Sequence, residues 1–359
     1  MADQQVDLFL DQLVDAPIKD ERSLMEFPFF SLQKRPRTEP LTYDDGVVQI
    51  TIEPGSNGIA TIWDKDLLIY LASLINEKIE KGEHVDRTMQ FHAYDFMRVT
   101  GRGTGKRAYE LFLDALHRLR STNIQTTIAA GGDIERRGFG WIEDWRVLER
   151  TNSQGKKAMA GVEVTLNRWM FNSIVQDRRV LTINRNYFGL TMGLERRLYE
   201  LARKHVGSQT EWFISLSRLA EKCGTVGSLR KFKYRIVEIS KRANIPDYHL
   251  ELVDSDTAKT PFRTKGQPLV RFTPLKVASE IGVKEKPKPK QTSSAQETGE
   301  PGRVSIHTYE KAKELFPGYN IDFLEDRWIG WTASKGTVLK APDKAFLAWC
   351  RTYTQNNPI

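Results

Sequence analysis

The chain has 359 residues, enough for two or three domains that each bury a core of their own. Its 54 Lys and Arg against 46 Asp and Glu give a net charge of +8, which favours a polyanionic partner such as nucleic acid. No apolar run is long enough to span a membrane, and the acidic amino terminus does not resemble a secretory signal. Cys223 and Cys350 form no metal-like pair, so we expect a cytoplasmic protein without disulfides or structural zinc.

Residues 1–22 are expected to form a flexible N-terminal tail. Within it, the sequence QVDLF at positions 5–9 resembles the short peptide by which bacterial replication proteins bind the sliding clamp. Leu8 and Phe9 would fill an apolar pocket, and the Gln5 amide, two residues before Asp7, would make directed hydrogen bonds. The alternative is a small amphipathic helix, because apolar residues here also recur at helical spacing.

Residues 23–170 are expected to form a first domain with an N-terminal arm, residues 25–46, that docks Phe27, Phe29 and Phe30 on it. The spacing of apolar residues predicts helices at about 64–81 and 92–99, and a basic helix after the glycine-rich turn at 100–105. The period then shortens towards two, which predicts strands. Those strands lie at 47–54, 123–130, 138–151 and 162–167, with 123–130 and 138–151 forming a hairpin that carries Arg136 and Arg137 near its tip. Three helices followed by a hairpin describe a winged helix-turn-helix, whose third helix lies in the major groove.

The glycine-rich turn and its basic helix occur twice. A shift of 123 positions (224 minus 101) lays residues 221–242 over 98–119, so Gly224 matches Gly101 and Arg230 matches Arg107. Residues 98–120 contain six Lys or Arg and two acidic residues, and residues 228–243 contain six and one. Charges that were merely solvated would not need to repeat at the same positions.

Residues 171–278 are therefore expected to form a second winged domain. The patterns predict an extended lead at 180–188, helices at 194–207, 215–224 and 228–243, and wing strands at 248–253 and 268–275, with Lys265 near the wing tip. Residues 279–303, rich in Pro, Lys, Ser and Glu, predict a disordered linker. Residues 304–359 predict a small helical C-terminal domain. The expected fold class is α+β, with tandem winged helix-turn-helix domains.

The side chains expected to contact DNA lie at the two turns, at the starts of the two basic helices and in the wings, where they can reach base edges or phosphates. They are Arg102, Thr104, Lys106, Arg107, Arg118, Arg136, Arg137, Ser228, Arg230, Lys231, Tyr234, Lys241 and Lys265. Arg118 and Lys241 are expected to contact phosphates or to be plain solvated charges, rather than to contact bases.

Catalytic chemistry was weighed against these patterns. The segment GTGKR at 103–107 is not a Walker A loop, since Thr100 and Arg107 occupy the positions that need Gly and Ser or Thr. Asp254 and Asp256 are better explained by a loop than by a metal pair. We therefore expect a binding protein rather than an enzyme, with no catalytic residue, metal or cofactor.

The segments EFPFFSLQKR at 26–35, DFMRVTGRGTGKRAYELFLDALHRL at 95–119 and LERRLYELARKHVG at 194–207 resemble the RepA-type plasmid replication initiators, particularly the replication initiator protein A family. The resemblance implies a protein that binds repeated double-stranded origin sites, or iterons, helps to open the adjacent DNA and recruits host proteins. The host partners expected from the resemblance are the host initiator and the replicative helicase, whereas the sliding clamp is expected from the peptide at 5–9, which lies outside the resemblance. Such relatives often repress their own gene as homodimers and initiate replication as monomers. A transcription repressor without a replication role remains the alternative.

Overall fold

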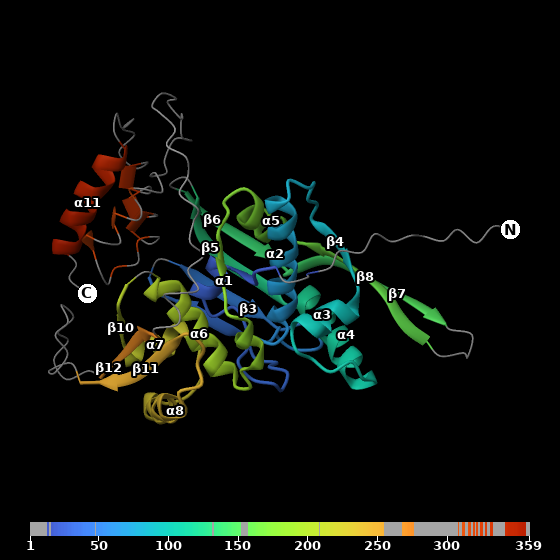
Figure 1. The fold of residues 1–359 in the computed structure, drawn as a ribbon. Helices are drawn as coiled ribbons and strands as arrows, with labels where there is room; N and C mark the ends of the chain where they lie inside the picture. Colours follow the sequence, from blue (N-terminus) through green and yellow to red (C-terminus); the bar gives the residue numbers. More distant parts are fainter. Residues whose placement is uncertain are drawn as a thin grey trace.

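The computed structural model describes residue 13, residues 16–46, 48–130, 133–151, 157–207, 209–254 and 268–275, parts of 308–332, and residues 342–356. Its central part contains two winged helix-turn-helix domains (Figure 1). Among the described helices, none is long and apolar enough to cross a membrane.

The first winged domain is built from helices around a three-stranded antiparallel sheet in the order β4-β8-β7. Its elements are α2 (Lys65–Glu80), β4 (Thr88–Phe91), α3 (Ala93–Val99), α4 (Lys106–Ser121), β7 (Ile142–Thr151) and β8 (Lys157–Leu166). The predicted helices are confirmed, but β4 lies in a segment that was not expected to form a strand.

The second winged domain repeats this order, with a sheet in the order β10-β12-β11. Its elements are α6 (Gly193–Val206), β10 (Trp212–Ser215), α7 (Leu216–Lys222), α8 (Leu229–Arg242), β11 (Tyr248–Val253) and β12 (Leu269–Pro274). Helix α7 begins 123 positions after α3 (216 minus 93), and α8 begins 123 positions after α4 (229 minus 106). The structure therefore confirms the repeat at the spacing that the sequence indicates.

The predicted wing of the first domain was wrong. Strand β5 (Asn123–Ala130) pairs with β6 (Asp133–Phe139), and both belong to a separate sheet in the order β2-β3-β5-β6. That sheet is completed by β2 (Leu41–Asp44) and β3 (Gln49–Glu53). The wing is instead the β7–β8 hairpin.

The physical reason lies at Gly140 and Trp141, which separate β6 from β7. A side chain at Gly140 would approach the Arg120 carbonyl oxygen to 2.9 Å, so the chain passes close to the end of α4. The backbone N–H of Trp141 donates to the Leu119 carbonyl oxygen at 3.0 Å, and the Trp141 ring is fully buried. The segment 138–151 is thereby divided between two sheets.

The arm is part of the folded core. Phe29 and Phe30 are buried against Trp141, with ring centroids 5.3 and 4.8 Å away. Strand β1 (Lys19–Glu21) pairs antiparallel with β9 (Val180–Thr182), and α1 (Arg22–Glu26) follows it directly. The folded part of the chain therefore begins before residue 23.

The fold also engages residues further towards the amino terminus. Ile18 and Leu13 are each 1% exposed, and the Leu13 N–H donates to the Asp95 carboxylate on α3 at 3.0 Å.

One hydrophobic cluster extends from Leu13 to Phe272 and includes side chains of the arm and of both winged domains. Helix α5 (Arg168–Val175) and the short 3₁₀ helix η1 (Arg185–Gly189) lie in the chain between the two domains. Near the carboxyl terminus, α11 (Pro342–Asn356) packs in a second, smaller cluster around Trp328 and Phe346. The predicted linker at 279–303 lies outside the described residues.

Candidate nucleic-acid interface

The two helix-turn-helix units turn at equivalent glycines. Gly101 follows α3 with φ +66°, and Gly224 follows α7 with φ +60°. This left-handed conformation is easily adopted only by glycine, and it ends a helix while redirecting the chain. In the first unit the turn lies between two helices, whereas a phosphate-binding loop of the Walker type follows a strand.

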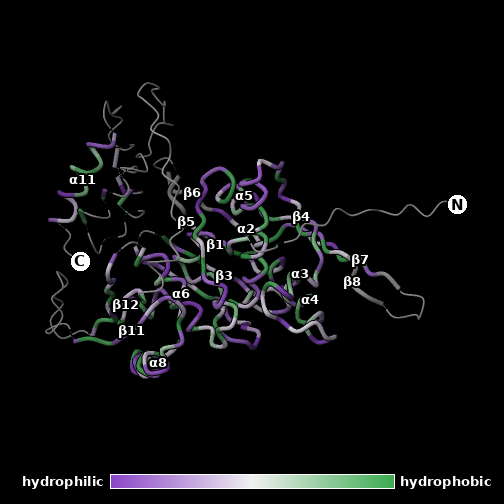
Figure 2. The backbone as a smooth tube through the Cα atoms, viewed as in Figure 1, coloured by the Kyte–Doolittle hydropathy of each residue, from purple (hydrophilic) through white to green (hydrophobic). Residues whose placement is uncertain are grey.

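Helix α8 has a buried face and a cationic outer face. Ser228 caps it by accepting a hydrogen bond from the Lys231 N–H at 3.5 Å, and Phe232, Ile236 and Ile239 are buried against the sheet. Its outer face over the first two turns is exposed and contains no acidic residue. The side chains on that face are Arg230, Lys231, Lys233, Tyr234 and Arg235. Figure 2 shows α8 with both hydrophilic and hydrophobic colours, as expected for an amphipathic helix.

Helix α4 presents a weaker cationic face. Thr104 is exposed in the turn, and the side chains of Lys106 and Arg107 are 92% and 74% exposed at the helix start. Both cations approach the same carboxylate, that of Glu110, at 4.0 and 3.2 Å respectively. Glu110 therefore neutralises part of the charge that the equivalent turn of α8 leaves open.

Arg102 and Arg118 require a correction, because both side chains turn into the protein. Arg118 donates two hydrogen bonds to Asp64 at 2.7 and 2.8 Å, and its side chain is 12% exposed. These hydrogen bonds raise the pKa of Arg118, against the effect of its partial burial. Arg102 donates to Asp66 at 2.9 Å and to the Trp63 carbonyl oxygen. Both side chains are part-buried in these ion pairs, which makes them weaker candidates for DNA contacts than the exposed cations.

The remaining predicted residues are placed as follows. Arg136 and Arg137 were expected at the tip of a wing formed by 123–130 and 138–151, but they lie on β6, which does not belong to the β7–β8 wing. Lys241 is 70% exposed near the end of α8, 3.5 Å from Glu238. Lys265 and the clamp-like peptide residues Gln5, Asp7, Leu8 and Phe9 lie outside the described residues.

Some exposed residues at this surface were missed. Val226 is 71% exposed in the second turn and Leu229 is 44% exposed at the start of α8. Leu111, 42% exposed, was also missed, although it is the counterpart, 123 positions earlier (234 minus 111), of the predicted Tyr234, which is 68% exposed. The sequence repeat already aligns Tyr234 with Leu111. A large apolar side chain within a cationic helix face was therefore the signal that could have identified Leu111.

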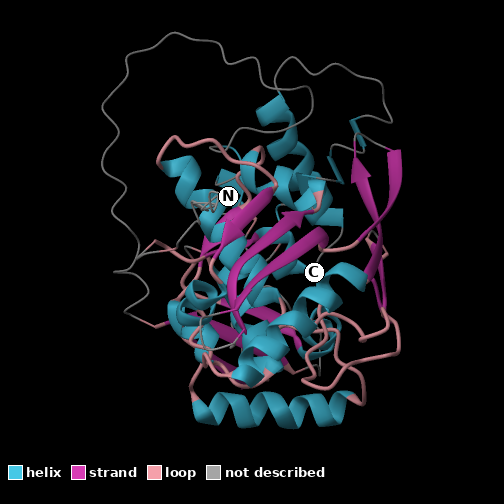
Figure 3. Ribbon diagram, turned by 90° about the vertical axis from the view of Figure 1, so that its right-hand side faces the viewer, coloured by secondary structure: helices cyan, strands magenta, loops and turns pink. Residues whose placement is uncertain are grey.

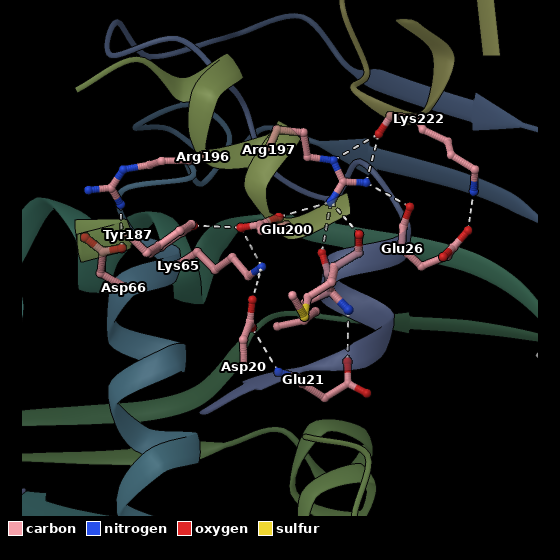
Figure 4. A network of polar contacts seen from close by, with 12 residues as sticks. Asp20, Glu21, Glu26, Lys65, Asp66, Tyr187, Arg196, Arg197, Glu200 and Lys222 are labelled. Carbon is pink, nitrogen blue, oxygen red and sulfur yellow. Dashed lines mark hydrogen bonds and ion pairs between the residues drawn. The ribbon is translucent and has the colours of Figure 1, made fainter. Parts of the chain in front are cut away.

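Buried ion pairs connect the arm to both winged domains (Figure 4). Lys65 at the start of α2 lies 2.7 Å from Asp20 of β1, just before the arm, and 2.8 Å from Glu200 of α6. Burial raises the pKa of Asp20 to about 7, although Lys65 acts to lower it. Arg196 of α6 lies 2.6 Å from Asp66 of α2. Side chains of the motif LERRLYELARKHVG therefore join the two domains.

The second domain binds the arm through both the backbone and a side chain of the arm. Arg197 donates hydrogen bonds to the carbonyl oxygens of Leu24, Met25 and Glu26. The Glu26 carboxylate pairs with Lys204 at 2.7 Å, with His205 at 3.0 Å and with Lys222. Burial alone would raise the pKa of Glu26, but Lys204 and Lys222 hold it well below its usual range, while burial lowers the pKa of His205. The arm and the two domains thus form one unit.

Comparison with known proteins agrees with this architecture. Residues 19–250 match the sequence model of the family described as replication initiator protein A. A protein from Wigglesworthia glossinidia brevipalpis that is named as a replication protein is 34% identical over 242 residues. The match covers 67% of this chain and 86% of the relative. The chain belongs to the replication initiator protein A family.

Two solved structures match this chain at low sequence identity. Domains 2 and 3 of RctB match this family member with a TM-score of 0.50 and 15% identity, covering 70% of this chain and 98% of that structure. The Pi initiator protein in complex with iteron DNA matches with a TM-score of 0.40 and 16% identity, covering 60% and 92%. At such identities the likeness concerns the fold. The expected tandem winged-helix fold is confirmed.

Proposed function

We propose that this chain initiates plasmid replication by binding repeated sites in the origin through its two winged domains. The observation that carries the proposal is the outer face of α8, where four cations and an exposed tyrosine follow the turn and no acidic residue intervenes. A helix of this kind, placed after a helix-turn-helix turn, fits the major groove and its negatively charged edges.

The two basic helices contribute unequally. Arg230 and Lys231 are the strongest candidates for base contacts, because they lie in the first turn of α8, beside the exposed hydroxyl of Ser228. Arg107 of α4 occupies the position equivalent to Arg230, but Glu110 lies 3.2 Å from its guanidinium. A base contact by Arg107 must therefore compete with that ion pair. Helix α8 is the principal determinant of sequence preference in this proposal.

The shared core sets how the two helices meet DNA. Helices α4 and α8 both lie along the lower side of the molecule in Figure 1, and Figure 3 shows α8 lengthwise along the lower edge. Since buried ion pairs and one hydrophobic cluster join the domains, the two helices are presented at a fixed separation. Each protein would bind two half-sites with a fixed spacing.

The test is quantitative footprinting on the repeats beside the gene. Replacing Arg230 with alanine is expected to lower affinity by about 5- to 150-fold, which corresponds to about 1–3 kcal/mol, and to relax the preference at one base pair. Arg107→Ala should have a smaller effect. Lys344→Ala on α11 is a matched control, since it removes an exposed cation from the separate C-terminal cluster. Unchanged footprints in both arginine variants would refute the proposal.

Origin opening and recruitment of host proteins need a separate test from DNA binding. Deleting residues 1–9 removes the clamp-like peptide but leaves β1 and the buried Leu13 in place. Deleting residues 303–359 removes the segment after the linker. If the chain is an initiator, these deletions should abolish plasmid maintenance and leave repeat binding within about twofold of the full chain. If both truncated chains still maintain the plasmid, the recruitment part of the proposal fails, and a repressor becomes the better assignment.

A further inference from the structure

A basic segment of the arm, residues 33–37, is held against the first domain at both of its ends. On one side, the Ser31 N–H donates to the Ala60 carbonyl oxygen at 3.0 Å, and the Ile62 N–H donates to the Ser31 carbonyl oxygen at 2.9 Å. On the other side, the Ile59 N–H donates to the Arg37 carbonyl oxygen at 2.9 Å. The intervening Lys34 and Arg35 are exposed. We call residues 33–37 the arm loop.

The arm loop adjoins the helix-turn-helix unit of the first domain. The Lys34 ammonium lies 5.3 Å from the centroid of the Trp63 ring, a cation–π distance. The carbonyl oxygen of the same tryptophan accepts a hydrogen bond from Arg102, which directly follows the glycine of the first turn. Trp63 therefore connects the arm loop to the first turn.

The arm loop also adjoins the second helix-turn-helix unit. A cavity of about 340 Å³ is lined by Lys34 and Arg37 of the loop, Thr225 and Val226 of the second turn, and Arg235 of α8. A side chain at Gly224 would approach the Cβ atom of Pro28 to 2.7 Å, so the arm packs directly on this turn. No acidic residue lines the cavity within the part of the chain that the structure describes.

The cations around this cavity come from distant parts of the sequence. Lys34 and Arg235 are exposed and belong to segments about two hundred residues apart. The Arg37 guanidinium is already engaged with the carbonyl oxygens of Glu39 and Pro40, at 2.9 and 2.8 Å. Lys34 and Arg235 are thus the two side chains best placed to receive an external anion.

We propose that the arm loop and Arg235 bind phosphates of the DNA backbone between the two half-sites, an inference that rests on the proposed DNA binding by α4 and α8. The arm loop lies between the two turns that precede α4 and α8. A duplex that contacts both helices must therefore pass the arm loop. Long, flexible cations on a loop suit phosphates rather than base edges. The loop then fixes the register of the duplex without adding sequence preference.

The test measures the salt dependence of repeat binding by the full chain. A lost phosphate contact reduces the slope of log affinity against log salt by about 0.9, so the advantage of the unmutated chain over Lys34→Ala should shrink about 3.5-fold between 50 and 200 mM salt. Lys34→Arg should restore the slope. Lys81→Ala, which removes an exposed cation at the end of α2, is the matched control and should leave the slope unchanged.

A second measurement locates the phosphates. Single neutral methylphosphonates placed between the half-sites should weaken the unmutated chain at one or two positions, and at the position that Lys34 contacts they should have no further effect on Lys34→Ala. If Lys34→Ala keeps the original slope and the same methylphosphonate sensitivity, the inference is wrong while DNA binding stands. If the unmutated chain does not bind the repeats, the proposed function itself fails. Binding of ATP that Lys34→Ala abolishes, with the DNA slope unchanged, would assign the cavity to a nucleotide and overturn the inference.

Discussion

Glu26 offers the sharpest test of the claim that the arm holds the two domains together. It is 3% exposed, and its carboxylate lies among Lys204, Lys222 and His205, all from the second domain. In Glu26→Gln the shape of the side chain is kept, but buried cations lose their counter-charge. Removing one partner of a buried ion pair costs about 3–5 kcal/mol, mainly because the remaining charge stays desolvated.

The magnitude converts directly into a thermal shift. For a folded unit of this size, 1 kcal/mol at the midpoint corresponds to roughly 2–4 °C, so Glu26→Gln should lower the melting temperature by about 6–20 °C. The measurement is thermal unfolding followed by circular dichroism, with urea titration to obtain the free energy of unfolding. Glu77→Gln is the control, since it breaks an ion pair with Lys81, which is 57% exposed, and should produce only a small fraction of the effect.

The pH dependence gives an independent check. Because the pKa of Glu26 is lowered in the folded chain, its contribution is present above the ordinary carboxyl pKa of about 4.3 and is lost as pH falls through the lowered value. The difference between the unmutated chain and Glu26→Gln should be full at pH 7 and shrink in strong acid. A difference below about 0.5 kcal/mol at pH 7 would refute the argument, because burial and pairing would then nearly cancel.

The remaining predictions concern the two turns and the two basic helices. Gly101→Ala should lower the free energy of unfolding by about 1 kcal/mol, since φ is +66° but the space around it is open. Gly224→Ala should lower it by about 2–4 kcal/mol, because its new Cβ would also meet Pro28. Equal losses in urea titrations would contradict the packing of the arm on the second turn. In competition assays with altered repeats, Arg230→Ala should change the preferred base more than Arg107→Ala does, and the reverse order would assign the main base contacts to α4.

The sequence was most informative where structure is local. The helical spacing of apolar residues located α3, α4, α7 and α8, and the repeat aligned Gly101 with Gly224, whose φ angles indeed agree. The short strands β4 and β10 were missed, because four-residue strands directly before helices gain their identity only by pairing with β8 and β12 further along the chain.

The wing and part of the site depended on distant contacts. Residues 123–151 were interpreted as one hairpin because their alternation is continuous, but the burial of Trp141 under Phe30, more than a hundred residues earlier, divides them between two sheets. Counting cations identified the basic helices without showing where each side chain points. Arg118 turns towards Asp64 and Arg102 towards Asp66, and neither direction follows from spacing within one helix.

The hydrogen bond from Leu13 to Asp95 limits how far from the first domain a partner that binds the amino-terminal peptide can lie. In the sequence Phe9 stands four positions before Leu13, and an extended chain advances at most about 3.5 Å per residue, so those four positions can reach at most about 14 Å from the anchor on α3. A protein that takes the peptide at 5–9 must therefore stand beside the helix-turn-helix unit of the first domain. If a sliding clamp is held there, it would compete for space with DNA on the first domain. The order in which the clamp and the DNA bind would then matter as well as their affinities.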